Sequence, residues 1–339
     1  MQIVVAGNIC VDLLPAIPEA ISISPGRITG IGPLAFQPGG CVFNTGTALS
    51  ALGSDVDIVS TIGDDYLGTL LSDALARRRI DLTHVEVRKD LRTSYSIVIE
   101  TLDMDRSFWH HAGASSAFTG HEIDATCADL VHLGYPSVLT DLLMQGARPL
   151  VELFSRIHDA GATTSMDLCV VDPASPAGEL DWKLVMDRLL PNVDVLSPSI
   201  DDLTSIAYNG VGSGDSDVVS NARGLVDAGA AIVMISAGER GSFLKSASYE
   251  RLSAAGRAVR PLSAEWADFE SWIPAAPIDK VVTTNGAGDT ATAGLLYGIA
   301  TGMTPQQAGT FAARAASAKI QGKRLESLER SAVSHSHGG

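Results

Sequence analysis

The sequence is short of cysteine and of basic residues, and these shortages exclude several classes of protein. Its four cysteines are widely separated and form no C-x-x-C pair, so neither a disulfide framework nor a zinc site is indicated. Lys and Arg number 24 against 39 Asp and Glu, and the formal net charge of −15 argues against a nucleic-acid-binding surface. The G-x-x-x-x-G-K-[ST] loop is also absent, which excludes a lysine-based phosphate cradle.

Long apolar runs are missing as well. No stretch reaches about 18 apolar residues, and the first residues, MQIVVAG, are too short and too uncharged for a signal peptide. We therefore expect a cytoplasmic protein with no membrane partner. Hydrophobic residues make up 45% of the 339 positions and charged residues only 19%, which is enough apolar material for one large α/β domain or two modest ones.

Short β-branched runs alternate with longer helical patterns along most of the chain. Continuous apolar strands separated by helices are typical of a parallel sheet that is covered on both faces. The pattern therefore predicts a layered α/β architecture. The predicted strands are residues 3–6, 56–61, 130–133, 163–166, 193–196 and 231–235.

Three segments depart from this rhythm. Residues 13–38 are rich in Pro, Ile and Gly without a helical period, and residues 92–112 contain a predicted hairpin, so we expect a small β-lid built from both. Residues 254–277 carry three prolines together with Trp266 and Trp272. We interpret this third segment as a surface insertion with both indoles exposed.

The strongest chemical signal is VVTTNGAGDTATAG, residues 281–294, a short apolar approach followed by a glycine loop and a helix of small residues. A helix that begins at such a loop presents unpaired N–H groups and a positive dipole end to an anion. Gly286 and Gly288 allow a close approach to the backbone, and Asp289 falls in the first helical turn. Phosphoryl transfer needs stabilisation of the moving phosphoryl group and a proton acceptor, and this one loop can supply both.

Two other interpretations of the loop stay open at this point. In isolation, Asp289 is equally a helix N-cap residue. Gly286, Gly288 and Ala291 also match a G-x-G-x-x-A dinucleotide fingerprint. That reading is weakened because no acidic residue follows a next strand at the right distance and because the motif lies close to the C-terminus.

The N-terminal third supplies the context. Asp12 closely follows the first strand, and Gly39 and Gly40 open a helix that contains Asn44. Recognition of a polyol needs short donors and acceptors on rigid backbone, where a carboxylate accepts paired hydroxyls and an amide both donates and accepts.

Together these motifs resemble the ribokinase-like, or PfkB, family of carbohydrate kinases over about residues 1–322. The resemblance implies an α/β fold of the three-layer α/β/α type, with a central, mostly parallel sheet and a β-lid at about 13–38 and 92–112. Residues 323–339 would form a C-terminal tail. The matching segments are residues 7–12, 39–44, 51–53, 63–68 and 286–289.

The resemblance also implies an activity, the ATP-dependent phosphorylation of a hydroxyl, expected to be a primary one, of a small sugar or sugar derivative. In such kinases the residue matching Asp289 is the general base, and the amides matching Gly286, Ala287 and Gly288 form an anion hole. The positions matching sugar contacts are Asp12, Gly39, Gly40 and Asn44. The positions matching nucleotide contacts are Ser236, Gly238, Gly241 and Thr284.

Three departures from the family pattern stand out. Where the family has N-x-x-E, this chain has Ser199 and Asp202, and Asp202 is the residue we expect at Mg²⁺. Thr283 replaces an aspartate, which puts activation by a monovalent cation in doubt. Cys169 replaces the asparagine of a D-x-N segment that begins at Asp167.

The lid is expected to close over the substrate and exclude water, with Trp109 as a substrate contact. Because an isolated small sheet has exposed edges, the lid also suggests a homodimer. Two alternatives to a sugar kinase remain, namely a nucleoside kinase of the same fold and a non-catalytic sugar- or nucleotide-binding relative.

Overall fold

The main sheet of the computed structural model lies between two layers of helices, and the structure describes residues 1–17, 25–101, 104–208, 210 and 212–328. Within these residues the main sheet has nine strands in the order β13-β12-β11-β10-β9-β8-β1-β4-β5. They are β1 (Gln2–Gly7), β4 (Asp55–Gly63), β5 (Val85–Arg88), β8 (Leu130–Gly134), β9 (Thr163–Asp167), β10 (Val195–Leu196), β11 (Ile232–Ser236), β12 (Ser242–Ser246) and β13 (Glu270–Ile273).

The sheet is parallel from β11 to β5, and only β12 and β13 run antiparallel to their neighbours. All six strands predicted from apolar runs are present in it. Their side chains are almost entirely buried, as expected for strands covered on both faces. The predicted three-layer fold class is confirmed.

The alternation of side chains in β1 shows how both faces are filled. Val4 and Ala6 belong to one apolar cluster, whereas Ile3 and Val5 belong to another on the opposite face. The first cluster includes α3 (Thr140–Asp159), α4 (Trp182–Leu189), α5 (Ile200–Ser205) and α6 (Asp215–Asp227). The second includes α1 (Gly40–Ala51), α7 (Tyr249–Ser253), α8 (Ser263–Trp266), α9 (Ala287–Ala300) and α10 (Pro305–Ile320).

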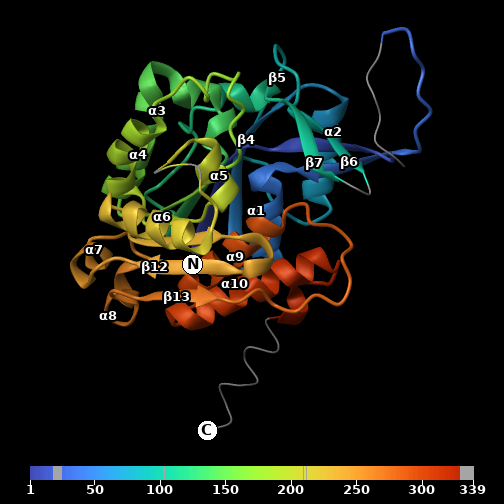
Figure 1. Ribbon diagram of the computed structural model, residues 1–339. Helices are drawn as coiled ribbons and strands as arrows, with labels where there is room; N and C mark the ends of the chain where they lie inside the picture. Colours follow the sequence, from blue (N-terminus) through green and yellow to red (C-terminus); the bar gives the residue numbers. More distant parts are fainter. Residues whose placement is uncertain (18–24, 102–103, 209, 211, 329–339) are drawn as a thin grey trace.

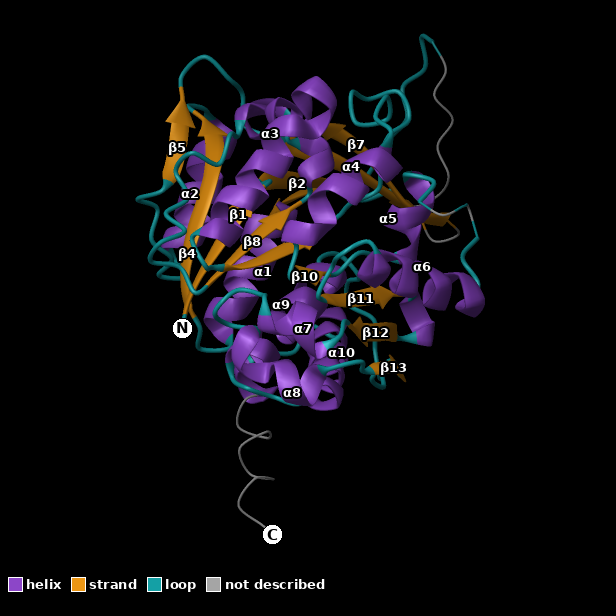
Figure 2. Cartoon of the chain, turned by 90° about the vertical axis from the view of Figure 1, so that its left-hand side faces the viewer, coloured by secondary structure: helices purple, strands orange, loops and turns teal. Residues whose placement is uncertain are grey.

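Figure 2 shows these helices on the two sides of the strands. The remaining helix, α2 (Tyr66–Ala76), packs with α1 and β4 in a third cluster. None of the helices in the described part of the chain is both long and apolar enough to cross a membrane.

A separate four-stranded sheet projects from the body beside α2 (Figure 1). Its order is β3-β2-β6-β7, from β2 (Cys10–Pro15), β3 (Leu34–Gly39), β6 (Tyr95–Thr101) and β7 (Met104–His111). This is the predicted lid, although residues 18–24 and 102–103 of the two predicted segments lie outside the described residues, as do residues 329–339 of the predicted tail. The lid begins at Cys10, so Asp12 is itself a lid residue.

The interpretation of residues 254–277 as an exposed insertion was wrong. This segment contains α8 and the edge strand β13, and the Trp266 side chain is fully buried, at 0% exposure. Its indole Nε1 donates to the Met303 carbonyl at 3.0 Å, and the Trp272 ring packs edge-on against Phe243. An edge strand of four residues has too little periodicity to be recognised among prolines.

Candidate active site

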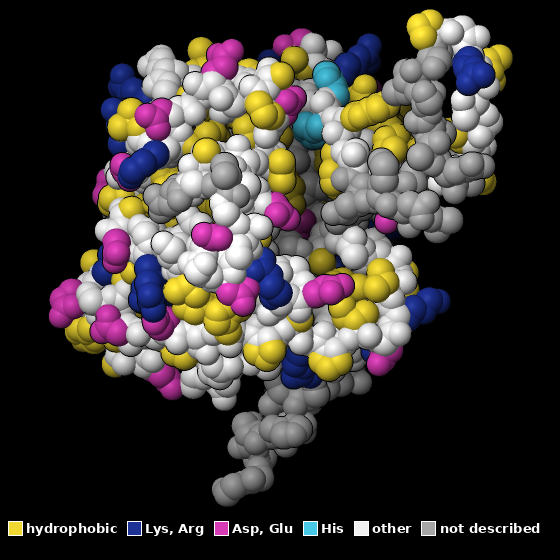
Figure 3. Space-filling model, in the orientation of Figure 1, with side chains coloured by type: hydrophobic (Ala, Val, Ile, Leu, Met, Phe, Trp, Pro, Cys, Tyr) yellow, Lys and Arg dark blue, Asp and Glu magenta, His cyan; other side chains and the backbone are white. Residues whose placement is uncertain are grey.

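The candidate site lies where the parallel strands end. Gly7 of β1 pairs with Gly134 of β8, and Gly134 pairs with Asp167 of β9, so these carboxyl ends meet at one edge. Ligands of open α/β sheets bind outside this edge. The space-filling view shows a hollow between the body and the lid on this side (Figure 3).

Asp289 stands in the first turn of α9 and is only 2% exposed. Asn44 of α1 donates through Nδ2 to Oδ2 of Asp289 at 2.9 Å. The Tyr135 hydroxyl, just after β8, lies 2.9 Å from both carboxylate oxygens. Three elements far apart in the sequence therefore converge on this one carboxyl group.

Burial raises the pKa of Asp289, while the hydrogen bonds from Asn44 and Tyr135 lower it. Both donors are neutral, so the charge of the carboxylate is solvated without a strong ion pair. A carboxylate held in this way remains available to accept a proton, as a general base must.

Asp12 is joined to the same loop from the lid side. Asn285, which stands just before the first glycine of the loop, donates through Nδ2 to Oδ2 of Asp12 at 2.7 Å. A Cβ on Gly39 would lie 2.5 Å from that Oδ2, and a Cβ on Gly40 would lie 2.7 Å from the Asn8 carbonyl. Both glycines are therefore required by close packing around Asp12 and the start of α1.

The predicted anion hole is the N-terminal end of α9. Gly286 is the N-cap with φ of 71°, and the Ala287 amide donates to the Thr284 carbonyl at 3.3 Å. A Cβ on Gly288 would meet nothing within 4 Å, so the protein itself does not require glycine there.

The predicted nucleotide residues form the hairpin turn between β11 and β12. A Cβ on Gly241, whose φ is 94°, would lie 2.1 Å from the Ile273 carbonyl, whereas a Cβ on Gly238 would meet nothing within 4 Å. Ser236 forms a parallel bridge with Ser199, so the turn lies next to the start of α5. Thr284, the other predicted contact, is exposed on the glycine loop.

The predicted metal residue, Asp202, is buried and forms a capping box with Ser199. The Ser199 amide donates to Oδ2 of Asp202 at 2.7 Å, and the Asp202 amide donates to Oγ of Ser199 at 3.1 Å. Burial raises the pKa of Asp202 to about 6, and it raises that of Asp167 well above its ordinary value, with the charges of Asp289 and Asp202 adding to the effect.

Mg²⁺ prefers oxygen ligands and is commonly held by one or two carboxylates plus substrate phosphates. The two buried carboxylates of Asp167 and Asp202 fit such an ion, because a cation would relieve their mutual repulsion. No group of three metal-ligating side chains occurs in the described part of the chain.

The other two departures have local partners. Thr283 accepts a hydrogen bond at Oγ1 from the Asn285 amide at 3.1 Å. The Cys169 thiol lies 2.9 Å from the Ser137 hydroxyl, and burial raises the pKa of Cys169 to about 12, so it is a neutral thiol.

Strand register decides which lid residues share a face with Asp12. Gln37, Asp12, Ser96 and His110 pair in succession across the four strands, and the Ser96 hydroxyl lies 3.0 Å from Nδ1 of His110. Trp109 falls in the adjacent row and therefore on the other face of the lid, where it is 51% exposed. The structure thus brings His110, and not Trp109, to the Asp12 side.

Sequence reasoning missed Tyr135 and Asn285. Tyr135 lies two residues after the predicted strand 130–133, which marks it only as a residue near the carboxyl edge. Asn285 stands just before the segment 286–289 that matches the family, so no pattern marks it.

Comparisons with known proteins agree with this geometry. Residues 2–329 match the pfkB family of carbohydrate kinases. Fructoselysine 6-kinase of Escherichia coli is 24% identical over 306 residues, which cover 89% of this chain and 90% of that protein. Arabidopsis thaliana ribokinase complexed with ribose and ATP has a TM-score of 0.73 at 19% identity, covering 100% of this chain and 99% of that one.

A Burkholderia thailandensis nucleoside kinase in complex with inosine has a TM-score of 0.70 at 19% identity and covers 99% of both chains. At these identities the solved structures show the ribokinase-like fold alone. The family match, in contrast, spans nearly the whole chain and implies ATP as the phosphoryl donor for a sugar or nucleoside acceptor. The protein is a phosphotransferase that belongs to the pfkB family of carbohydrate kinases.

Proposed function

We propose that this kinase transfers the γ-phosphoryl group of ATP to a primary hydroxyl of a small sugar or sugar derivative, with Asp289 as the general base. One observation carries the proposal. The buried carboxyl group of Asp289 is held by Asn44 beside the amides that begin α9, and the same loop is bonded to Asp12 through Asn285. A proton acceptor, an anion site and a hydroxyl-binding group thus lie together.

In this proposal the acceptor binds with its hydroxyls against Asp12 and Asn44, and the close packing at Gly39 and Gly40 holds Asp12 and the start of α1 in place. The reacting hydroxyl donates its proton to the Asp289 carboxylate as its oxygen forms a bond to the γ-phosphorus. The bond from the γ-phosphorus to the β–γ bridging oxygen breaks, and ADP leaves with that electron pair.

Charge on the moving phosphoryl group is stabilised by the amides of Gly286, Ala287 and Gly288, and the Ala287 amide exchanges its long 3.3 Å bond to the Thr284 carbonyl for a phosphoryl oxygen. The open space at Gly288 supports this assignment, because a glycine that the fold does not need is explained by a ligand that comes close to the backbone.

The nucleotide would lie along the turn of Ser236, Gly238 and Gly241 and beside Thr284. Asp202, with Asp167 close by, would hold Mg²⁺, which supplies positive charge to the nucleotide phosphates when bound. The bridge between Ser236 and Ser199 supports this arrangement because it joins the turn to the helix that carries Asp202.

The test is a screen for ADP release by the full chain with ATP and Mg²⁺ over ketoses, pentoses, sugar acids and nucleosides. We expect turnover of at least one free sugar, and Asp289→Asn should lower kcat by roughly 10²- to 10⁴-fold with KM nearly unchanged. If the chain turns over nucleosides and no free sugar, the acceptor is a nucleoside. If Asp289→Asn keeps near-normal turnover, Asp289 is not the general base.

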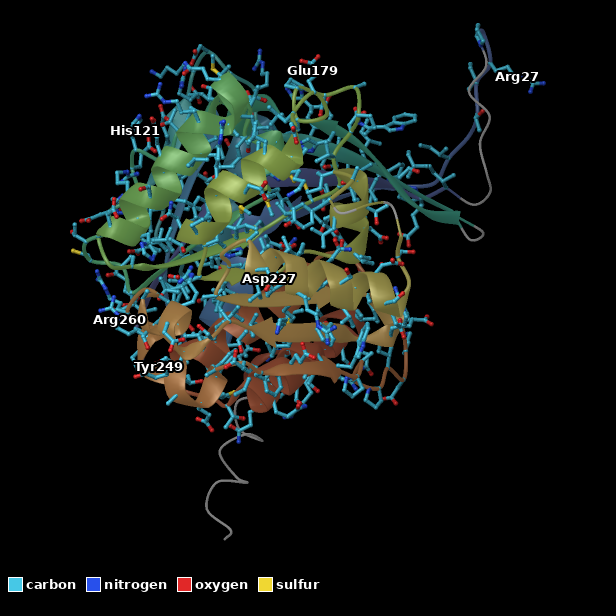
Figure 4. All side chains as sticks on the ribbon, turned by 60° about the vertical axis from the view of Figure 1, so that its left-hand side comes forward. Arg27, His121, Glu179, Asp227, Tyr249 and Arg260 are labelled. Carbon is cyan, nitrogen blue, oxygen red and sulfur yellow. The ribbon has the colours of Figure 1, made fainter. Side chains whose placement is uncertain are left out.

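We also propose that the lid pairs with that of a second copy. Phe36 and Trp109 lie in one row of the lid on the face away from Asp12, and both are about half exposed. Arg27 lies between β2 and β3 in the sequence, beyond the lid strands (Figure 4). Light scattering during size-exclusion chromatography should report a dimer, and a monomer at all concentrations would contradict this proposal.

A further inference from the structure

Tyr135 is the residue in contact with Asp289 that the proposed mechanism leaves without a role. Its hydroxyl lies 2.9 Å from each carboxylate oxygen, whereas Asn44 reaches only Oδ2. The Tyr135 hydroxyl therefore contacts both carboxylate oxygens, and the Asn44 amide contacts one. Burial, with the charges of Asp289 and Asp167 adding to it, raises the pKa of Tyr135 well above its ordinary value, so the hydroxyl keeps its proton and acts as a donor.

The backbone at Tyr135 is unusual in a way that favours a function. Its φ of 62° and ψ of 52° lie in the left-handed region, which residues other than glycine seldom adopt. Residues held there by their surroundings concentrate at active sites.

The surroundings hold this conformation from both sides. The Tyr135 amide donates to the Asp167 carbonyl at 3.2 Å, and its carbonyl accepts from the Val138 amide at 3.1 Å. A Cβ on the preceding Gly134 would lie 1.8 Å from Sγ of Cys41, so no other residue fits there. The chain therefore leaves β8 in a direction that sends the Tyr135 ring to Asp289.

We propose that Tyr135 is a positioning residue for the general base, whose hydroxyl holds the Asp289 carboxylate in the ionised form and in the orientation that accepts the proton of the substrate. This inference rests on the proposed function of Asp289. An Asp289 carboxylate accepting from Asn44 and Tyr135 still has a lone pair for the incoming hydroxyl, since a carboxylate accepts about four hydrogen bonds.

Other titratable groups also face Asp289. Asp12 from β2 raises the pKa of Asp289, and Lys319 from α10 lowers it. Asp167 from β9 and Asp202 from α5 lie within its electrostatic reach, and the neutral Cys41 thiol of α1 lies close by. All of these are unchanged when the Tyr135 hydroxyl is removed, so a change in the pH profile would report on that hydroxyl.

The experiment compares kcat and KM against pH for the wild type and Tyr135→Phe, using the sugar found in the acceptor screen. We expect kcat to fall by about 10- to 100-fold, the factor for one hydrogen bond to a charged group. KM should stay nearly constant, and the acid limb of the kcat profile should move to higher pH because the ionised base loses a donor.

Tyr297→Phe is the matched control, since Tyr297 lies on the same helix as Asp289 with its ring stacked on Phe311 at 5.2 Å. It should leave kcat and the acid limb unchanged. A double variant with Asp289→Asn should be no slower than Asp289→Asn alone, because the hydroxyl acts through the base.

Three outcomes would overturn the role of Tyr135. The first is a wild-type kcat in Tyr135→Phe. The second is an equal loss of kcat at every pH with no shift of the acid limb, which is what a purely structural defect would give. The third is a further loss in the double variant. Should the Phe variant not fold, Tyr135→Asn, which tolerates left-handed backbone, is expected to show the same upward movement of the limb. Normal turnover by Asp289→Asn would instead reject the proposed base.

Discussion

Two buried aspartates at opposite edges of the main sheet show how partners decide what a carboxylate can do. Asp194, 0% exposed, directly precedes β10 at the amino edge, and Asp289, 2% exposed, lies at the carboxyl edge. Their burial is the same. Their partners differ, because Asp194 contacts a guanidinium group and backbone amides, whereas Asp289 is bonded to a neutral amide and a phenol.

Asp194 joins three parts of the chain. Its Oδ1 lies 3.1 Å from Nη1 of Arg251 in α7, the helix that begins at Tyr249 (Figure 4). Its Oδ2 accepts from the Thr164 amide at 3.1 Å and from the Gly256 amide at 2.9 Å. These donors come from β9, from α7 and from Gly256 just after it, so the Asp194 carboxylate holds β9, β10 and α7 together.

The comparison teaches that burial alone does not mark a catalytic carboxylate. A buried charge with a cation and backbone donors is committed to stability. A buried charge with only neutral side-chain donors is held in place yet remains a proton acceptor, at the expense of stability.

The largest expected effect is on the free energy of unfolding when Asp194 is replaced. Asp194→Ala should lower the free energy of unfolding by about 3–5 kcal/mol, because Arg251 and two backbone amides lose their buried partner. Urea titration measures this loss, and kcat per folded molecule should be unchanged. If Asp194→Ala has wild-type stability, the hydrogen bonds of Asp194 are dispensable, and the contrast between a structural Asp194 and Asp289 does not hold.

The pH dependence of stability tests the second carboxylate of the comparison, Asp289. Burial raises the pKa of Asp289, so the folded chain binds this proton more readily than the unfolded chain does. Stability is therefore lost as the pH rises from the ordinary aspartate value, about 3.9, through the raised value. Asp289→Asn avoids that loss and should be more stable than the wild type at neutral pH, with the difference disappearing in acid. Thermal unfolding at several pH values would contradict this if the difference were constant.

Two glycines sharpen the same division between structure and chemistry. Gly241→Ala should cost about 1–3 kcal/mol, because its Cβ would lie 2.1 Å from the Ile273 carbonyl at a positive φ. Gly288→Ala meets nothing and should keep the stability or raise it by up to about 1 kcal/mol, since alanine favours helices. We expect Gly288→Ala to lower kcat/KM through its methyl group at the anion site. Equal stability losses in both variants would contradict the assignment.

The smallest effect concerns the two faces of the lid. His110→Ala should raise KM for the sugar by about 5-fold, the value of one hydrogen bond of about 1 kcal/mol, with kcat nearly unchanged. Trp109→Ala, next in sequence but on the opposite face, should leave KM unchanged and weaken self-association in light scattering. The reverse pattern would mean that the lid presents its other face to the substrate.

Much of the fold could be predicted from the sequence because its signals are local. Apolar runs of strand length indicated six of the strands, and the glycine loop indicated the start of α9 where it is observed. The edge strand β13 and the burial of Trp266 were not predicted, since short edge strands carry little periodicity and burial depends on what covers a residue. The division into a domain of residues 1–322 and a tail stays a prediction.

The candidate site divides in the same way. Gly286, Gly288 and Asp289 are contiguous, so their chemistry could be inferred from one segment, and Asp12 and Asn44 followed from short motifs. Tyr135 and Asn285 could not be inferred, because neither stands in a motif of its own and only the contacts with partners 154 and 273 positions away mark them. Nor could local sequence decide between Trp109 and His110, which depends on the register of β7 with β6.

By itself, the sequence determined a parallel α/β core and a glycine-bounded helix start with an aspartate in its first turn, because backbone conformation and helix polarity are local properties. Only the tertiary structure decided which donors surround that aspartate and which face of the lid looks toward it. Hydrogen bonds between distant segments depend on how the strands are ordered and how they are aligned, and neither is written in any single stretch of residues.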